Sequence, residues 1–402
     1  MSATPPSPHP GRAGEVFAAF ARLGLTCFGG PIAHVAYFHQ EFVHRRGWLD
    51  DARFAQLLSL CQFLPGPASS QLGAAIGLLR AGWIGGLAAF VAFTLPSALA
   101  LFAFAVLAPQ LNRGIGDAVA HGLELVAVTV VAHGLAGMAR RLTPDPPRIA
   151  IAVAAAVLAL AGNGAWTQSL AIALGALLGG WLCRSVPGEA ATAWTLPYGR
   201  RAALAFAAAF AFGLALALCW PQTGDATPAA WTAAFYRAGA LVFGGGHVVL
   251  PLLQHAVVDN GWIGAERFLV GYGAAQAVPG PMFSFAAYLG ALAPLHAPPA
   301  LGAALALAGL FLPGFLILLA ALPLWTSLVR HRAAARAVAG VNAAVVGLLA
   351  AALWTIGEAG VRGAADVAIV AVGVALLAVA RVSALWVVLW CVASAIAAAL
   401  AG

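Results

Sequence analysis

The sequence predicts an all-α polytopic membrane protein with about thirteen transmembrane segments in two homologous halves. Hydrophobic residues make up 62% of the chain and charged residues only 8%, against about 25% charged residues in soluble domains. Apolar runs close to the ~20 residues that span a bilayer recur along the whole chain. A Gln-x-x-Pro-Gly-Pro block ending in serine occurs twice, as QFLPGPASS at 62–70 and QAVPGPMFS at 276–284.

The expected segments form two series. The first comprises 15–43, 52–79, 83–108, 115–139, 149–161 and 165–183, followed by a connecting segment at 202–220. The second comprises 230–258, 265–293, 299–325, 334–357, 365–380 and 384–401. The expected domains are a disordered tail (1–14), a first repeat (15–190), a linker with its own transmembrane helix (191–229) and a second repeat (230–402).

The two series align residue by residue, which indicates a duplication. Phe20, Arg22, Gly24, Phe28, Gly29 and Gly30 recur at a constant offset as Phe235, Arg237, Gly239, Phe243, Gly244 and Gly245. After one gap, Gly47, Trp48, Arg53 and Phe54 recur as Gly261, Trp262, Arg267 and Phe268, and the Pro-Gly-Pro blocks then coincide. Shared apolar composition would produce chance matches of alanine and leucine, whereas these fall on glycine, proline, arginine and aromatic residues.

The Pro-Gly-Pro blocks predict interrupted transmembrane helices. Proline removes a backbone donor and clashes with the preceding turn. Within a bilayer the freed backbone groups are tolerated only where protein, a cavity or a ligand satisfies them. Broken segments at equivalent places in two halves are the best sequence indication of a transporter binding site. Re-entrant hairpins at these blocks remain an alternative.

Arginine placement predicts the topology. If each half crosses six times and 202–220 adds one crossing, equivalent helices face opposite ways. The even-numbered loops carry more arginines than the odd-numbered ones, so on this plan the positive-inside rule predicts a cytoplasmic N-terminus. The counts alone do not separate inverted from parallel halves. The first loop, with Arg45, Arg46 and Arg53, is an exception. Re-entrant Pro-Gly-Pro segments would instead make the halves parallel.

The FGGP sequence at 28–31, the FGGG sequence at 243–246, both Pro-Gly-Pro blocks and the two-half plan resemble the chromate ion transporter (CHR) family in its long two-domain form. The resemblance covers essentially the whole chain. It implies an inner-membrane, multi-pass protein with halves of opposed topology that exports chromate, conferring resistance. Short members of that family consist of one half and work in pairs. The second half departs by having Gly246-His247 where the first has Pro31-Ile32.

A tetrahedral dianion in a low-dielectric site needs positive potential and hydrogen-bond donors. Arg22 and Arg237 lie inside apolar runs at equivalent positions, and paired guanidinium groups suit an oxyanion; snorkelling to the interface is the alternative. The glycines could let the backbone approach substrate or let helices pack closely. The candidate substrate-binding residues are Arg22, Gly29, Gly30, Gln62, Pro65, Gly66, Pro67, Ser69, Ser70, Gln71, Arg237, Gly244, Gly245, Gly246, Gln276, Pro279, Gly280, Pro281 and Ser284.

Three further residues are candidates for coupling transport to an ion. His34 and His247 flank the glycine turns and titrate near neutral pH. Glu124, with His121 one turn before it, is a carboxylate within an apolar run, which is a functional candidate by default. A purely structural role is the alternative for each of the three.

Other functions lack sequence support. There is no Walker motif, HExxH or GxSxG, and no grouping of histidine with aspartate stands out, so we expect no enzyme, cofactor or metal. The five cysteines are scattered, and no basic cluster with interleaved aromatics suggests nucleic acid. The expected partners are an oxyanion and the lipid bilayer. A sulfate carrier, an anion channel and a homodimer remain open.

Overall fold

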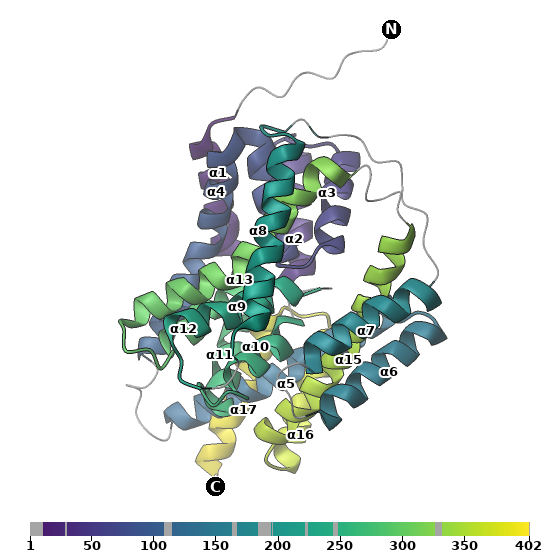
Figure 1. The fold of residues 1–402 in the computed structure, drawn as a ribbon. Helices are drawn as coiled ribbons and strands as arrows, with labels where there is room; N and C mark the ends of the chain where they lie inside the picture. The colour runs from purple at the N-terminus through teal and green to yellow at the C-terminus, as the bar shows by residue number, and fades with distance from the viewer. Residues whose placement is uncertain are drawn as a thin grey trace.

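The computed structural model describes residues 11–28, 30–107, 115–162, 167–183, 194, 196–221, 224–243, 248–325 and 332–401. In this part of the chain the regular secondary structure is helical, without strands (Figure 1). The first half contains α1 (Ala13–Thr26), α2 (Gly30–His39), the π-helix η1 (Gln40–Arg45), α3 (Asp51–Phe63), α4 (Ala68–Leu107), α5 (Ile115–Leu142), α6 (Pro146–Ala161) and α7 (Thr167–Leu182). The connecting helix is α8 (Arg200–Cys219).

The second half contains α9 (Pro228–Leu241), α10 (Val249–Val257), α11 (Ala265–Ala277), the 3-10 turn η4 (Met282–Ser284), α12 (Phe285–Ala291), α13 (Pro299–Ala321), the 3-10 turn η5 (Leu322–Leu324), α15 (Arg332–Gly360), α16 (Ala364–Ala378) and α17 (Ala384–Ala401). Asp50 and Asp145 cap α3 and α6 by accepting hydrogen bonds from Arg53 and Arg148 backbone N–H groups.

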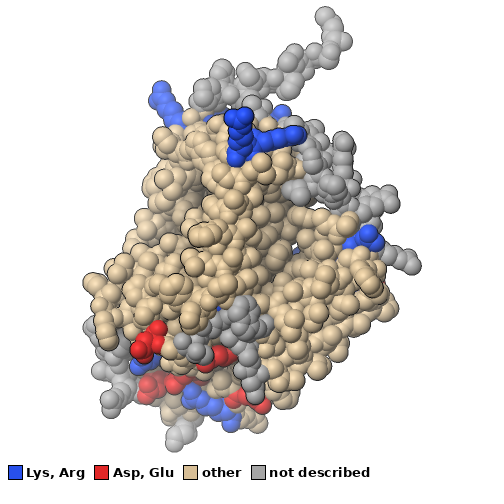
Figure 2. All heavy atoms as spheres, in the orientation of Figure 1, with Lys and Arg blue, Asp and Glu red and all other residues tan. Residues whose placement is uncertain are grey.

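The helical content and the apolar surface confirm an all-α membrane protein. Five helices among the described residues are long and apolar enough to cross a bilayer, within Ala68–Leu107, Gly116–Leu142, Arg200–Cys219, Pro299–Leu324 and Ala333–Gly360. Large apolar side chains point outward, with Trp181 90% exposed and Phe212 72% exposed. Figure 2 shows that the charged residues of one face gather mainly at its two ends, with a largely uncharged surface between them. Such a surface suits a lipid environment.

The prediction of continuous segments at 15–43 and 230–258 is wrong. The first divides into α1, α2 and η1, because the chain breaks before Gly30, whose φ is +73°. The second divides into α9 and α10. Each break lies at the Phe-Gly-Gly motif. The predicted tail also ends earlier, since α1 begins at Ala13 and the Gly11 N–H donates to the Arg80 carbonyl oxygen at 3.0 Å.

The prediction that the Pro-Gly-Pro segments are interrupted spans also needs correction, because the chain folds back at both. After the second block, the Tyr288 hydroxyl of α12 donates to the Arg267 carbonyl oxygen near the start of α11, at 2.9 Å. In the first half, α4 reverses at Ala81–Gly82, and Gly77 and Gly85 pack backbone to backbone across the reversal. Residues 68–80 therefore return alongside α3 before residues 83–107 run inward again.

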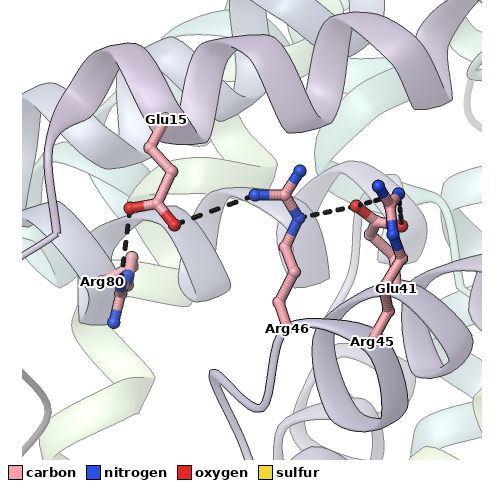
Figure 3. A network of polar contacts seen from close by, with 5 residues as sticks. All are labelled: Glu15, Glu41, Arg45, Arg46 and Arg80. Atoms are coloured by element: carbon pink, nitrogen blue, oxygen red, sulfur yellow. Dashed lines mark hydrogen bonds and ion pairs between the residues drawn. The ribbon is translucent and has the colours of Figure 1, made fainter.

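Ion pairs hold together the ends of two hairpins in the first half (Figure 3). The first hairpin consists of α1 with α2 and η1, and the second consists of α3 with residues 68–80 of α4. Arg46 lies between Glu41, at 2.6 Å, and Glu15, at 3.8 Å. Arg80 pairs with Glu15 at 3.3 Å, and Arg45 with Glu41 at 2.8 Å. The start of α1, η1 and the reversal of α4 therefore lie together at one end of the molecule.

Candidate functional site

Two reciprocal backbone hydrogen bonds join the halves at their breaks. The Gly66 N–H donates to the Val242 carbonyl oxygen at 2.7 Å, and the Gly280 N–H donates to the Cys27 carbonyl oxygen at 2.9 Å. In the repeat alignment Gly66 corresponds to Gly280, and Cys27 corresponds to Val242. Each Pro-Gly-Pro block thus meets the end of the first helix of the other half. We call this place the crossing.

The backbone at the crossing requires glycine. Gly66 has a φ of +120° and Gly280 a φ of +105°, a region that side chains with a Cβ rarely adopt. A Cβ on Gly66 would lie 2.8 Å from the Cα of Gly314, and one on Gly280 would lie 2.9 Å from the Ser97 Oγ. Ser97 and Gly314 themselves occupy equivalent positions, each one residue after a proline inside a helix.

Gln71 braces the first break. Its side chain is fully buried, and its Nε2 donates to the carbonyl oxygens of Pro65 at 2.9 Å and Gly314 at 2.8 Å. The first bond satisfies a carbonyl at the interruption, and the second ties α4 to α13. At the second break, the buried Ser284 hydroxyl donates to the Pro281 carbonyl oxygen at 2.6 Å.

Several buried polar atoms on the segments around the crossing have no hydrogen-bond partner among the described residues. They are Ser70 Oγ, Gln71 Oε1 and Thr94 Oγ1. The His34 ring lies against Phe93, with the centroids 5.3 Å apart. Buried polar groups are normally satisfied, so these unpaired atoms are candidates to bind water or a polar ligand.

Helices also begin at the crossing. α4 starts directly after Pro67, with Ser69 and Ser70 buried in its first turn, and η4 starts directly after Pro281. The first N–H groups of a helix have no partner inside it, and the helix dipole is positive there. Such ends bind anions. The crossing therefore combines free donors with positive potential and needs no charged side chain to do so.

The arginines Arg22 and Arg237 have different surroundings. Arg237 is buried, and its guanidinium donates to the Ala217 carbonyl oxygen of α8 at 3.4 Å. Arg22 is exposed, and no described residue forms a hydrogen bond or ion pair with its guanidinium. The difference follows from α8, because this connecting helix covers the second half. The described contacts do not bring the two arginines together.

Other predicted residues are dispersed. Gln62 is exposed, whereas Gln276 is half-buried and lies within hydrogen-bond reach of the Tyr272 hydroxyl. Gly30 begins α2 beyond the first break. Pro65 and Pro279 are half-buried beside the crossing. Gly29, Gly244, Gly245, Gly246 and His247 lie outside the described residues.

Glu124 belongs to a separate ionic cluster that the sequence revealed only in part. Its Oε2 lies 3.3 Å from His121 Nδ1 and accepts from the Arg362 guanidinium at 3.1 Å. The Nε2 of His121 lies 3.0 Å from Asp366 Oδ1, and Asp366 also accepts from the Arg362 N–H. Arg362 and Asp366 were missed because nothing in the sequence links them to a helix so far upstream. The expectation that histidine and aspartate do not group is wrong here.

A groove of about 370 Å³ lies between α4 and α13. Its lining is apolar apart from Thr94, and includes Phe90, Phe311 and Phe315. An anion would be poorly solvated there. The polar crossing is therefore the better candidate site.

Comparison with known proteins identifies the family to which the chain belongs. The "Chromate transporter" family model matches residues 14–181 and again 229–399. The chain is 28% identical to a chromate transport protein of Pseudomonas aeruginosa over 86% of this chain and 80% of that protein. It is 27% identical to a chromate transport protein of Cupriavidus metallidurans, over 89% of this chain and 86% of that protein.

A probable chromate transport protein of Synechococcus elongatus is 28% identical over 84% of this chain and 83% of its own length. No solved structure matches the chain at a significant level. The double family match spans most of the chain. The chain therefore belongs to the chromate transporter family.

Proposed function

We propose that this protein exports chromate across the cytoplasmic membrane as a secondary carrier, and so confers resistance to chromate. Family membership and the names of its full-length relatives support the substrate. The units that move would be the repeats at 15–190 and 230–402, with 191–229 connecting them. Alternating access would then expose the crossing to one side of the membrane at a time.

The observation that carries the proposal is the reciprocal pair of hydrogen bonds at the crossing. Because Gly66 and Gly280 each bond to the opposite half, relative motion of the repeats would change these two bonds. The buried hydroxyls of Ser70 and Thr94, on segments beside the crossing, have no hydrogen-bond partner among the described residues. A chromate dianion could accept from these donors and from helix N-termini, which would offset the loss of its hydration.

We further propose that the repeats are inverted. α1 begins beside Arg80, and the rings of Tyr198 and Phe206, at the start of α8, lie beside Trp83. The 20 residues of α8 then extend about 30 Å. α9 returns along it, with the Tyr236 hydroxyl donating to the Phe210 carbonyl oxygen. α1 and α9 thus start at opposite ends, as halves of opposed topology require, with the N-terminus cytoplasmic.

On sequence grounds, re-entrant Pro-Gly-Pro segments would make the two halves parallel. That holds only if the Phe-Gly-Gly segments cross the membrane, but these segments fold back as well. Each half then contains two hairpins that return to their starting side, so re-entry no longer implies parallel halves. Energy would come from an ion gradient or the membrane potential. Glu124, His34 and His247 remain the coupling candidates, and Arg22 and Arg237 remain candidates for attracting the dianion.

Uptake of radiolabelled chromate by everted membrane vesicles tests the function, with and without an energy source and with sulfate as competitor. We expect saturable uptake only when the vesicles are energised. Sulfate-preferring uptake would change the substrate, and unsaturable passive flux would indicate a channel. Ser70→Ala should weaken uptake about tenfold, as loss of one hydrogen bond to a charged ligand predicts. The matched control is Ser59→Ala, on the exposed face of α3.

A further inference from the structure

A π-helical turn at the end of the first hairpin brings two histidines together. In an α-helix, residues five apart point in directions about 140° apart, since each residue turns about 100°. The chain instead continues from α2 as the π-helix Gln40–Arg45, whose hydrogen bonds join residues five apart. The rings of His39 and His44 consequently meet edge to face, with their centroids 4.7 Å apart and the rings nearly perpendicular. Single π-helical turns occur frequently at functional sites.

The next helix adds a carboxylate to this pair. Asp51 is the first residue of α3, and its Oδ1 lies 2.7 Å from His39 Nε2. One ligand atom from each of His39, His44 and Asp51 lies within 4.8 Å of the others. This is the only such group of metal-ligating side chains in the part of the chain that the structure describes.

We propose that His39, His44 and Asp51 bind one divalent transition-metal ion, of the kind that prefers imidazole and carboxylate ligands, such as Zn²⁺. Two imidazoles and one carboxylate are a common three-ligand set for zinc, and water completes its tetrahedron. With bonds of about 2.0–2.1 Å, tetrahedral ligand atoms lie about 3.4 Å apart. The three side chains reach that spacing by small rotations, because His44 and Asp51 are exposed and His39 is half-buried.

The charges around the site leave Asp51 available. Arg45 and Arg46 are engaged by Glu41, and Arg53 lies 3.8 Å from Asp50. No described guanidinium lies within ion-pair distance of Asp51. The nearby arginines are thus matched by other carboxylates and do not occupy this ligand.

The bound ion would fasten α2 and η1 to α3, joining the two hairpins of the first half at their polar end. Asp51 aligns with Ala265 in the second half, which therefore lacks the carboxylate ligand. The metal site would therefore occur in the first half and have no counterpart in the second. This inference does not depend on which anion the protein carries.

Zinc titration of the full-length protein in detergent, after removal of any histidine tag, tests the site by competition with a chromophoric chelator. We expect one saturable site per chain and at least a tenfold loss of affinity in both His44→Ala and Asp51→Asn. The control is His255→Ala, because His255 also lies 2.7 Å from an aspartate but has no second histidine in such a group. That variant should bind zinc as the wild type does.

Co²⁺ supplies a second readout, since a tetrahedral site gives intense visible absorption that an octahedral surface ion lacks. The metal-free melting temperature of each variant shows whether it is folded. Absence of saturable binding by the wild-type protein would overturn the proposal. Unchanged affinity in a folded His44→Ala variant, or an equal loss in His255→Ala, would overturn it as well.

Discussion

The backbone N–H of Gly66 donates to the carbonyl oxygen of Val242 over 2.7 Å, joining the tip of a hairpin in the first half to the end of a helix in the second. Gly280 and Cys27 form the equivalent bond in the opposite sense. The glycine N–H at each break therefore finds its partner in the other half. A protein built from one such half would need a second copy to complete both bonds.

Gly66→Ala should disrupt the crossing. The variant suffers strain from a φ of +120° and a Cβ placed 2.8 Å from the Gly314 Cα. Gly82→Ala is the matched control, because Gly82 also has a positive φ, of +64°, but a Cβ there meets open space. We expect the control to lose about 1–3 kcal/mol of stability from strain alone and Gly66→Ala to lose more, together with chromate uptake.

Melting temperature in detergent and uptake in vesicles separate the two contributions. Equal melting temperatures for the two variants would show that the contact with Gly314 is unimportant. Full uptake by a folded Gly66→Ala protein would argue against the crossing as the transport site.

The repeat alignment predicted which residues are equivalent, and the two hydrogen bonds of the crossing are formed by equivalent pairs, Gly66 with Val242 and Gly280 with Cys27. What it could not give is the direction of the chain after each break. Two half-length helices that fold back have the same length and apolar composition as one continuous span, so periodicity does not distinguish them. The reversal at Gly82, by contrast, falls between the expected segments 52–79 and 83–108, beside Arg80, so the sequence did indicate the position of this turn.

Pairwise contacts between distant segments were equally beyond sequence reasoning. Arg22 and Arg237 align perfectly, yet only Arg237 is covered, because α8 has no counterpart next to α1 among the described helices. The pairing of His121 with Asp366 joins α5 to α16, and no local pattern announces it. The count of thirteen transmembrane segments stays a prediction.

Arg22→Gln tests the proposed role of the arginines without disturbing the packing, since Arg22 is exposed. If the guanidinium attracts the dianion, uptake should fall at least tenfold while the melting temperature stays the same; Arg22→Lys should retain part of the activity because it keeps the charge. Arg237→Gln should in addition lower the melting temperature, because it removes the contact with Ala217. Unchanged uptake in Arg22→Gln would end the hypothesis for this residue.

The ion pairs of Figure 3 should make stability depend on pH. Burial raises the pKa of Glu41, but hydrogen bonds from Arg46 and Arg45 outweigh it and hold the pKa below its ordinary value near 4.5. A carboxylate whose pKa is lower in the folded protein than in the unfolded protein stabilises the fold. Its full contribution is present above the pKa of the unfolded state, and it is lost as the pH falls through the pKa of the folded state. We therefore expect the stabilisation by Glu41 to be complete at neutral pH and to disappear in acid.

Glu41→Gln should melt earlier than the wild type at pH 7, by the equivalent of about 1.5–3 kcal/mol for a hydrogen bond to a charged group. The difference should narrow as the pH falls below about 4.5. Glu358→Gln, at an exposed position on α15, serves as the control and should follow the wild type throughout. A difference between Glu41→Gln and wild type that stays constant down to strongly acidic pH would show that the loss comes from packing.

Glu124→Gln tests proton coupling. Glu124 is 1% exposed, and one of its oxygens has no partner among the described residues, while the other contacts His121 and Arg362. Asp366 faces the same histidine, and Glu266 of α11 also acts on Glu124 electrostatically. A carboxylate so placed can take up a proton and shift the balance of the whole cluster.

The glutamine variant keeps the size of the side chain but cannot change its charge. We expect exchange of labelled for unlabelled chromate to persist, because exchange needs no net proton movement, while accumulation driven by a pH gradient falls at least tenfold. Glu358→Gln again serves as control. If gradient-driven accumulation survives in Glu124→Gln, the proton passes elsewhere, and His34 becomes the next residue to replace. Loss of exchange and accumulation together would instead assign Glu124 to the fold or to substrate binding.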